Sequence, residues 1–555
     1  KSVHLPQHRT CSTRIFHHQH TILQTHKNLV MKIALAQLNY HIGNFDKNVE
    51  KIIASIESAK QQSADLIVFS ELSVCGYPPL DLLEQKDFIQ KCEEAISRIA
   101  MHAMGIGVII GSPLINKAER GKMLLNAALF LNNGKVEDIH CKTLLPTYDI
   151  FDEYRYFEPG NTHHLLQFKG EKIAITICED LWDTVVVENS FSKEKIYKTA
   201  PMEVLAKLNP DFIINIAASP FSYDKDHLRT RVLQENAQRW QKPLFYVNQV
   251  GANTEIIFDG ASKVINESGN VIYSLKSFEE ELYIFDTKTQ QSTDNKLLES
   301  ETKTAKIYNA LKLGLKDFFA KNNFKTATLG LSGGIDSAVV LALAAEAIGS
   351  QNIRVLLMPS EFSSEHSITD AVALAQNLGV QHDIISIKQT FDAFNNSLHP
   401  LFKGMPFNLA EENLQARIRG TMLMAISNKF GNILLNTSNK SEAAVGYGTL
   451  YGDMNGAVSV LGDVYKTDIY ALANYINREK EIIPVNTIIK PPSAELRPGQ
   501  KDSDSLPEYD ILDQILFAYI EQKLTIEEII SRNFDRHTVE RTIKMVNNNE
   551  FKRFQ

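Results

Sequence analysis

The sequence predicts two domains of different class, an α+β sandwich followed by an α/β domain built on a doubly wound parallel sheet. The chain has 555 residues, which is more than one hydrophobic core usually organises. Its first half alternates short apolar runs with amphipathic helices and ends near Ile284, a pattern typical of a closed α+β sandwich. From Thr304 onward, a strand–helix–strand unit predicts a parallel sheet with helices on both faces.

The individual elements follow from hydrophobic periodicity. Asn48–Lys60 has the period of an amphipathic helix, and eight apolar runs of the first half predict buried strands. These runs are Lys32–Leu38, Leu66–Phe69, Val108–Ile110, Ala127–Leu131, Ile173–Ile177, Phe212–Ile216, Leu244–Val247 and Val271–Tyr273. In the second half a helix from Thr304 precedes strand Thr326–Leu331, helix Ser337–Ile348 and strand Ile353–Met358.

Composition shifts divide the chain into a leader (1–30), a first domain (31–286), a linker (287–303) and a second domain (304–555). The linker is polar and lacks periodicity. Residues 1–30 carry six of the sixteen histidines and four basic residues but no acidic one. We expect a disordered leader, with a transit peptide or a metal-binding role for its histidines (His17, His18 and His20) as alternatives.

Composition also limits the partners. The formal charge of −8 disfavours a nucleic-acid backbone, and no apolar run approaches the ~20 residues of a membrane helix. The cysteines (Cys11, Cys75, Cys92, Cys141 and Cys178) have no paired or metal-type spacing. This favours free thiols in a reducing compartment, so we expect a cytoplasmic protein without nucleic-acid or membrane partners.

Three segments that follow predicted strands offer a carboxylate, an amine and a thiol: Glu71 in Phe-Ser-Glu-Leu, Lys142 in Lys-Thr-Leu-Leu-Pro, and Cys178 in Ile-Thr-Ile-Cys-Glu-Asp. Each alone has a structural explanation, as a helix cap, a solvated amine or a small core residue. Together they suit amide hydrolysis. A thiolate attacks the amide carbon, an ammonium lowers the thiol pKa and stabilises the oxyanion, and a carboxylate moves the protons.

In this order, the three segments resemble the nitrilase superfamily over roughly Met31–Ile284. The resemblance implies an αββα sandwich that hydrolyses glutamine, with Cys178 as nucleophile, Lys142 as oxyanion stabiliser and Glu71 as general base. It adds Glu153, in Phe-Asp-Glu, as a further carboxylate of the site. For glutamine binding it implies Tyr148, Ser219 and Lys225, although Asp224 stands where the family has glycine before Lys225.

A glycine-rich turn lies between a strand and a helix in the second half. It consists of Gly330, Leu331, Ser332, Gly333, Gly334, Ile335, Asp336 and Ser337. Glycines let backbone N–H groups approach a phosphate, and the helix N-terminus adds a favourable dipole. The turn lacks the Gly-Lys-Ser/Thr of a Walker loop. It resembles the pyrophosphatase loop of enzymes that split ATP between the α- and β-phosphates, which implies an adenine nucleotide α-hydrolase-like domain; a simple helix cap is the alternative.

Downstream segments choose within that class. Glu412-Asn-Leu-Gln-Ala-Arg, Thr437-Ser-Asn-Lys-Ser-Glu, Gly446-Tyr-Gly-Thr-Leu-Tyr-Gly-Asp, Pro491-Pro-Ser-Ala-Glu and Asn549-Glu-Phe-Lys-Arg form a series that resembles NAD synthetases. Ser438 stands where that family often has glycine. The resemblance implies the following residues: Asp336 and Glu442 for Mg²⁺; Thr437 and Lys466 for ATP; Asn413, Arg417, Glu442, Asp453 and Lys552 for deamido-NAD.

Both resemblances together imply a carbon–nitrogen ligase that amidates deamido-NAD through an acyl-adenylate, releasing AMP and pyrophosphate. Its ammonia would come from glutamine and pass between the sites, and the family implies Mg²⁺ and a homo-oligomer of high order. The rivals are a GMP-type or asparagine-type synthetase, a tRNA-thiolating enzyme and a pseudo-enzyme that senses NAD-like ligands. The Glu–Lys–Cys order disfavours the first, and the lack of cysteine after Cys178 disfavours the second.

Overall fold

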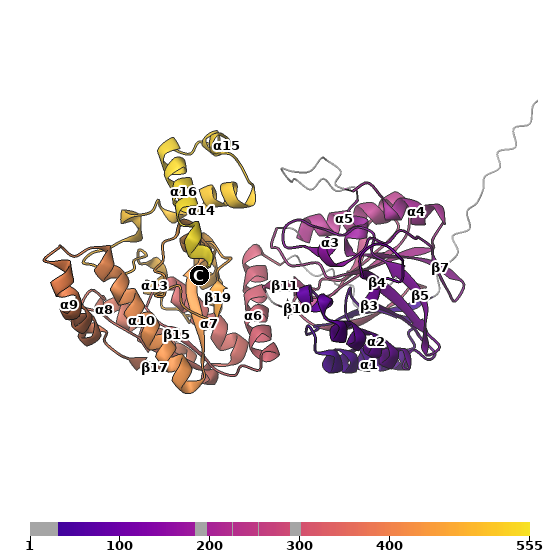
Figure 1. The fold of residues 1–555 in the computed structure, drawn as a ribbon, viewed down its shortest axis with the longest axis horizontal. Helices are drawn as coiled ribbons and strands as arrows, with labels where there is room; N and C mark the ends of the chain where they lie inside the picture. The colour runs from indigo at the N-terminus through magenta and orange to yellow at the C-terminus, as the bar shows by residue number, and fades with distance from the viewer. Residues whose placement is uncertain (1–30, 184–196, 225, 254, 289–300, 555) are drawn as a thin grey trace, which may run out of the picture.

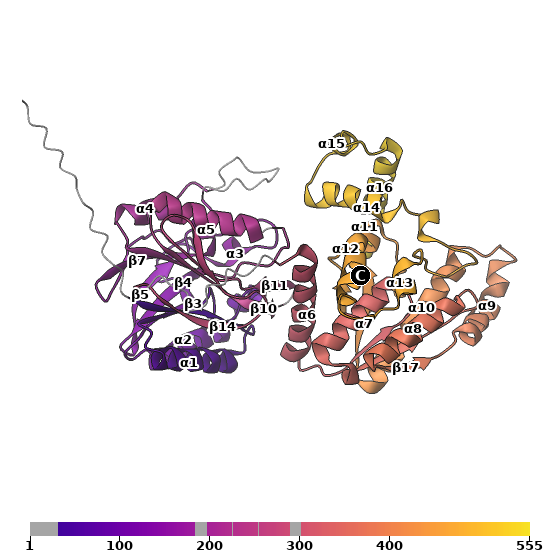
Figure 2. The ribbon, with the colours of Figure 1, turned by 180° about the vertical axis from the view of Figure 1, so that it is seen from behind.

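The protein is described by a computed structural model, which covers residues 31–183, 197–224, 226–253, 255–288 and 301–554. Two bodies lie side by side, and the long helix α6 (Lys303–Lys321) stands between them (Figures 1 and 2). Within the described ranges, no helix combines the length and apolar character needed to cross a bilayer.

The first body is a sandwich of two six-stranded mixed sheets, ordered β14-β1-β2-β3-β4-β5 and β13-β12-β9-β8-β7-β6. The first sheet consists of β1 (Lys32–Gln37), β2 (Leu66–Val68), β3 (Gly107–Ile115), β4 (Leu124–Asn132), β5 (Lys135–Cys141) and β14 (Glu281–Asp286). The second consists of β6 (Leu166–Phe168), β7 (Glu171–Ile177), β8 (Phe212–Ala217), β9 (Leu244–Asn248), β12 (Lys263–Ile265) and β13 (Val271–Ser274). A separate hairpin pairs β10 (Val250–Asn253) with β11 (Ile256–Asp259).

Helices cover the outer faces of both sheets. On the first lie α1 (Phe45–Gln61) and α2 (Lys86–Ala100), and on the second α4 (Pro201–Lys207) and α5 (Asp226–Trp240); the short α3 spans Glu153–Tyr156. The core between the sheets joins Leu35 and Ile109 of one to Ile175 and Ile214 of the other, all at most 4% exposed. The predicted αββα sandwich is confirmed.

The second body is built on a five-stranded parallel sheet, ordered β17-β16-β15-β18-β19. The strands are β15 (Ala327–Gly330), β16 (Ile353–Leu357), β17 (Gln381–Ile384), β18 (Ile433–Asn439) and β19 (Val458–Leu461). The strand order reverses between β15 and β18, and ligands of such sheets bind beyond the carboxyl ends of the strands at this switch point. The predicted doubly wound α/β domain is confirmed.

The remaining helices pack around this sheet and above it. They are α7 (Ile335–Ile348), α8 (Glu365–Leu378), α9 (Lys388–Phe402), α10 (Leu409–Phe430), α11 (Lys440–Val445), α12 (Lys466–Ile476), α13 (Val485–Ile489), α14 (Tyr509–Leu516), α15 (Ile526–Ile530) and α16 (Arg536–Asn548). Helices α14–α16 form the upper lobe in Figure 1; they share one small apolar cluster, and α14 and α16 share a second one with α11.

Helix α6 binds the sandwich through buried polar groups. Asp317 accepts hydrogen bonds from the Asn39 side-chain amide at 2.8 Å and from the Ala252 N–H at 2.7 Å. Lys321 donates to the carbonyl oxygens of Tyr40 and Ala252, both at 2.8 Å. Because these donors and acceptors would be desolvated without partners, the contacts fix α6 against the β10–β11 hairpin.

All eight predicted strands of the first half exist, but several further strands were not predicted. The clearest is β5, whose alternating sequence is charged and largely exposed, as suits an edge strand. A search for apolar runs misses such a strand because only one of its faces is partly covered. The leader and most of the linker lie outside the described residues, so their predicted character is not tested.

Candidate active sites

The carboxylate, amine and thiol predicted for amide hydrolysis lie together in the sandwich. Lys142 Nζ is fully buried, 2.7 Å from Glu71 Oε1 and 2.7 Å from Glu153 Oε2. Glu71 Oε1 also accepts a hydrogen bond from the Asn126 side chain at 2.8 Å. Cys178 follows β7 directly, is buried, and has a φ of 45°. Residues with side chains adopt this left-handed region infrequently, and active-site residues are among those that do.

Burial governs the protonation states of this cluster. It raises the pKa of the Cys178 thiol well above its usual value; Glu71 raises that pKa further, and Lys142 opposes both. Burial lowers the pKa of Lys142, but Glu153 and Glu71 outweigh it and hold that pKa well above its usual range. Lys142 lowers the thiol pKa, as expected, but burial together with the carboxylates Glu71, Glu179 and Glu153 outweighs it. A protonated thiol attacks only when a base takes its proton.

The further carboxylate, Glu153, is placed as the sequence implied. It begins α3, and it accepts a hydrogen bond from the Tyr77 hydroxyl at 2.9 Å. Burial raises the pKa of Glu153 to about 7, against the opposing effect of Lys142.

Tyr148, a predicted glutamine contact, is hydrogen-bonded to the carboxylate of the residue that follows the nucleophile. Glu179, the neighbour of Cys178, accepts hydrogen bonds from the hydroxyls of Tyr148 at 2.7 Å and Tyr197 at 2.8 Å. Burial raises the pKa of Glu179, and the two hydroxyls oppose that rise. A buried acid held by two tyrosines beside a thiol is suited to contact a polar substrate.

Of the other two predicted glutamine contacts, the structure describes Ser219 but not Lys225. Ser219 follows β8, and the N–H of its neighbour Ala218 donates to Glu71 Oε2 at 3.0 Å. This bond places the Ser219 segment against the proposed base. Lys225 lies outside the described residues, so its role stays a prediction.

The glycine-rich turn occupies the switch point of the parallel sheet. Residues Gly330–Ser337 connect the end of β15 to the first turn of α7. Gly333 has a φ of 80°, and a Cβ there would stand 2.2 Å from the Ser367 carbonyl oxygen, so only glycine fits. The hydroxyls of Ser332 and Ser337 lie 3.2 Å apart. No side chain caps the N-terminus of α7, which leaves its N–H groups for an anion.

Two carboxylates and an ammonium face one another beside this turn. Lys466 Nζ is 2.6 Å from Asp336 Oδ2 and 3.2 Å from Glu442 Oε1. Asp336 Oδ1 also accepts from the side-chain amide of Asn439, the last residue of β18, two positions after Thr437. Burial raises the pKa of Glu442 to about 8, with Lys466 opposing. Two hard carboxylate donors that share a single ammonium form a set that fits Mg²⁺ together with phosphate oxygens.

Residues implied for deamido-NAD gather around loop 446–453, which joins α11 to β19. Asp453 Oδ1 accepts the Thr449 N–H at 2.6 Å, and the Thr449 hydroxyl donates to Asn413 Oδ1 at 2.8 Å. Asn413 lies on α10, so these bonds tie the loop to that helix.

Two basic residues bind the same loop through its carbonyl oxygens. Arg417 Nε donates to Leu450 at 3.1 Å, and Lys552 Nζ donates to Gly446 at 2.7 Å and Gly448 at 2.9 Å. The structure thus brings together all four residues that the sequence assigned to this substrate besides Glu442.

Comparisons with known proteins agree with both halves. The family model described as carbon-nitrogen hydrolase matches residues 32–294, and the one described as NAD synthase matches residues 307–555. The glutamine-dependent NAD(+) synthetase of Synechocystis is 44% identical over 94% of each chain, and that of Acinetobacter baylyi is 42% identical over the same shares. The chain belongs to the glutamine-dependent NAD(+) synthetases.

Solved structures of this family have the same architecture. The Acinetobacter baumannii glutamine-dependent NAD+ synthetase, in complex with adenosine diphosphate, is 39% identical, with a TM-score of 0.77 over 95% of this chain and 94% of that one. A glutamine-dependent NAD(+) synthetase from Cytophaga hutchinsonii, 19% identical, shares the fold with a TM-score of 0.79 over 94% and 93% of the two chains.

The polar groups that hold the Glu71–Lys142–Cys178 cluster in place were not predicted from the sequence. Tyr77, Asn126 and Glu179 contact Glu153, Glu71 and Tyr148, as described above. Asp180 accepts the N–H groups of Thr143 and Leu144 at 3.0 and 2.9 Å. Only the position of Glu179 and Asp180 directly after Cys178 offered a local signal; Tyr77 and Asn126 are recognisable only in three dimensions.

Proposed function

We propose that this chain converts deamido-NAD to NAD, activating the carboxylate with ATP as an acyl-adenylate and taking ammonia from glutamine. The observation that carries the proposal is the presence, in one chain, of the buried Glu71–Lys142–Cys178 cluster and of a phosphate loop at the switch point of a parallel sheet. The relative from Acinetobacter baumannii is described with ADP, which supports an adenine nucleotide as ligand.

In the sandwich, the Cys178 thiol attacks the amide carbon of glutamine while Glu71 takes its proton. Lys142 stabilises the oxyanion of the tetrahedral intermediate, since its buried ammonium stays charged. Glu71 passes the proton to the departing ammonia, and a thioester remains on Cys178. Glu71 deprotonates a water molecule that attacks the thioester; glutamate is released, and Glu71 returns the proton to the Cys178 sulfur. Tyr148, Ser219 and Lys225 hold the glutamine.

In the second domain, the carboxylate of deamido-NAD attacks the α-phosphorus of ATP and pyrophosphate leaves. The loop Gly330–Ser337 holds the phosphates with its N–H groups, and Lys466 and Thr437 contact them. Asp336 and Glu442 would hold Mg²⁺, which when bound neutralises charge on the phosphates.

Residues of α10, loop 446–453 and the C-terminal segment orient the deamido-NAD carboxylate. Asn413, Arg417, Asp453 and Lys552 are the ones assigned to it, together with Glu442. Ammonia then attacks the acyl carbon of the adenylate, and AMP leaves as the amide forms.

Making ammonia beside its acceptor avoids its loss to solvent and its protonation. Helix α6 packs on β10 and β11 of the sandwich and on α7 and α12 of the second body, so the two bodies are in contact. A sheltered passage of ammonia between the two sites stays a prediction. The homo-oligomer of high order and the cytoplasmic location stay predictions.

The adenylate step is tested by the nucleotide product. The purified chain is incubated with deamido-NAD, ATP, Mg²⁺ and glutamine, and AMP, ADP and NAD are quantified. One AMP per NAD and no ADP supports the proposal. Formation of ADP in place of AMP would refute the acyl-adenylate intermediate. The absence of any NAD would refute deamido-NAD as the substrate.

A further inference from the structure

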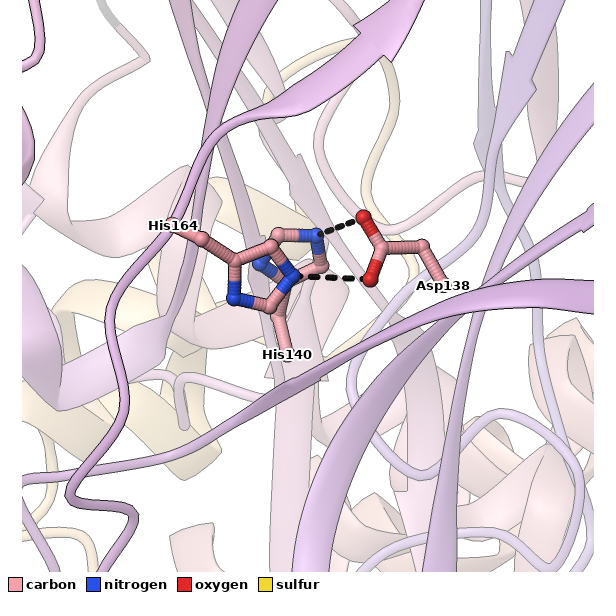
Figure 3. A group of neighbouring side chains, drawn as sticks. All are labelled: Asp138, His140 and His164. Atoms are coloured by element: carbon pink, nitrogen blue, oxygen red, sulfur yellow. Dashed lines mark hydrogen bonds and ion pairs between the residues drawn. The ribbon is translucent and has the colours of Figure 1, made fainter.

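A second cluster of ionisable side chains lies on β5, the strand that leads into Lys142. Asp138 and His140 alternate along β5 and therefore share one face of that edge strand. His164 reaches them from the segment just before β6 (Figure 3). His164 Nε2 is 2.7 Å from Asp138 Oδ1, His140 Nε2 is 3.4 Å from Asp138 Oδ2, and the imidazole rings stack with centroids 4.3 Å apart.

Without a bound cation, one buried nitrogen atom of this cluster lacks a good hydrogen bond. His140 is 6% exposed, and among the described residues its Nε2 has no hydrogen-bond partner of acceptable geometry. A neutral His140 faces Asp138 either with its lone pair, which the carboxylate repels, or with an N–H at 3.4 Å in poor geometry. Protonating both stacked rings would place two positive charges 4.3 Å apart around a single carboxylate. One cation bound by both ring nitrogens and the carboxylate removes both conflicts.

We propose that Asp138, His140 and His164 bind a divalent first-row transition metal ion, with Zn²⁺ as the fitting occupant. The three donor atoms lie within 4.8 Å of one another. Zn–N and Zn–O bonds of about 2.0–2.1 Å in a tetrahedron need donors roughly 3.3 Å apart, so small side-chain rotations suffice. The rings, now 21° from parallel, must tilt so that both nitrogens aim at the ion. Two imidazoles and a carboxylate suit such an ion better than Mg²⁺ or Ca²⁺, which favour oxygen.

A small cavity borders the two histidines, and His164 offers a route of entry. A cavity of about 10 Å³, enough for roughly one water molecule, is lined by His140, His164, His163, Cys141 and Asp180. The His164 side chain is 44% exposed, so an ion reaches the cluster without unfolding. Three protein ligands and one water make a common zinc geometry.

Such an ion would fasten two segments that carry the amidase site. β5 runs directly into Lys142, whose carbonyl oxygen accepts the Gly160 N–H at 2.8 Å, four residues before His164. Bridging β5 to His164 therefore restrains the backbone of Lys142 from both sides. We expect the bound ion to raise the melting temperature of the protein, because it binds the folded cluster and finds no assembled site in the unfolded chain.

The site is tested by counting Zn²⁺ on the full-length, chelator-stripped protein. A chromogenic chelator competes for Zn²⁺ with the wild type, His164→Gln, Asp138→Asn and the matched control His102→Gln. His102 is 40% exposed and pairs with Glu57 at 3.1 Å, so it resembles His164, but Glu57 is shared with the Lys60 ammonium instead of a second histidine. Histidines of residues 1–30 and the thiols are the same in every protein, and any Zn²⁺ they bind cancels in the comparison.

We expect His164→Gln and Asp138→Asn each to bind one Zn²⁺ per chain at least about 100-fold more weakly than the wild type. The control His102→Gln should bind this ion as tightly as the wild type. Co²⁺ substituted at the same site should give visible d–d bands that disappear in the two cluster variants. Glutamine-dependent NAD formation by the metal-free proteins, which needs the sandwich that carries the cluster, shows that each variant is folded. Equal Zn²⁺ stoichiometry and affinity in the wild type, His164→Gln and Asp138→Asn would overturn the proposal and leave a histidine–aspartate cluster that binds protons only.

Discussion

Lys306 Nζ, on α6, lies 3.0 Å from Asp226 Oδ2, at the first residue of α5, and this ion pair joins the two halves of the chain. Asp226 also pairs with Arg229 at 3.1 Å, and Arg229 pairs with Asp259. The Lys306 side chain is only 10% exposed, so the pair is shielded from solvent. The network therefore connects α6 to the region just after the Ser219 segment of the amidase site.

We predict that Lys306→Met lowers the efficiency with which ammonia from glutamine becomes NAD. Removing one partner leaves Asp226 partly buried with less compensation and loosens α6 from the sandwich. The amount of glutamate formed per NAD should rise at least about twofold. A twofold change corresponds to the lower end of the interaction energies of contacting residues, about 0.5 kcal/mol. The exposed Lys316 of the same helix, changed to Met, serves as control. An unchanged ratio in Lys306→Met would show that this pair plays no part in the coupling.

Tyr148→Phe should raise the KM for glutamine by about 10-fold and leave ammonium-dependent NAD formation unchanged. The variant loses a 2.7 Å hydrogen bond to Glu179, and bonds to charged groups contribute about 1.5–3 kcal/mol. Tyr156→Phe is the control, since its hydroxyl also donates to a carboxylate, Asp81, but at the surface. Steady-state kinetics with each nitrogen source decides, and equal KM values in the two variants would remove Tyr148 from the glutamine pocket.

Asp336→Asn should reduce NAD formation by at least about 100-fold with glutamine and with ammonium alike, because Asp336 is part of the phosphate loop and would hold Mg²⁺. The control is Asp463→Asn, a carboxylate that is 92% exposed and pairs with Lys440. Normal ammonium-driven turnover of Asp336→Asn at saturating Mg²⁺ would exclude this residue from the site.

Glu153→Gln should change how stability depends on pH. The pKa of Glu153 is raised from 4.5 to about 7 in the fold, chiefly by burial, so the folded state holds this proton more tightly than the unfolded chain. Deprotonation as pH rises from about 4.5 to about 7 therefore destabilises the wild type, on the order of 1–3 kcal/mol. The variant has no such proton, so its free energy of unfolding should rise relative to the wild type across this window.

Thermal unfolding of both proteins at pH 5 and pH 8 measures that difference. The exposed Glu203, which pairs with Arg239 on the surface, provides a control substitution to Gln. A difference between Glu153→Gln and the wild type that stays constant, or shrinks as pH rises, would contradict the raised pKa.

The sequence predicted best where chemistry and structure are local. The turn Gly330–Ser337 combines a strand end, a glycine at positive φ and a helix start within eight residues, so its position and its use follow from one segment. Glu71, Lys142 and Cys178 were each recognisable at a strand end. Their protonation was not, because the raised thiol pKa depends on burial and on charges from distant segments.

Groups that act through tertiary contacts could not be predicted from the sequence. Asn126 contacts Glu71 across 55 positions of the sequence, and Lys306 reaches Asp226 across 80. The cluster of Asp138, His140 and His164 was missed because β5 carries no apolar run, so the alternation that places two of these residues on one face was not evident.

We propose that Cys178 opens glutamine and takes no part in adenylation. The most direct test measures NAD formation by soluble Cys178→Ala, side by side with glutamine and with ammonium salts at mildly alkaline pH. We predict no NAD from glutamine and near wild-type synthesis from ammonium, since the adenylate site lies in the other body of the chain. Loss of a merely structural sulfur would cost roughly 1–3 kcal/mol and weaken both reactions together. Equal losses with the two nitrogen sources, or retained glutamine hydrolysis, would contradict the claim.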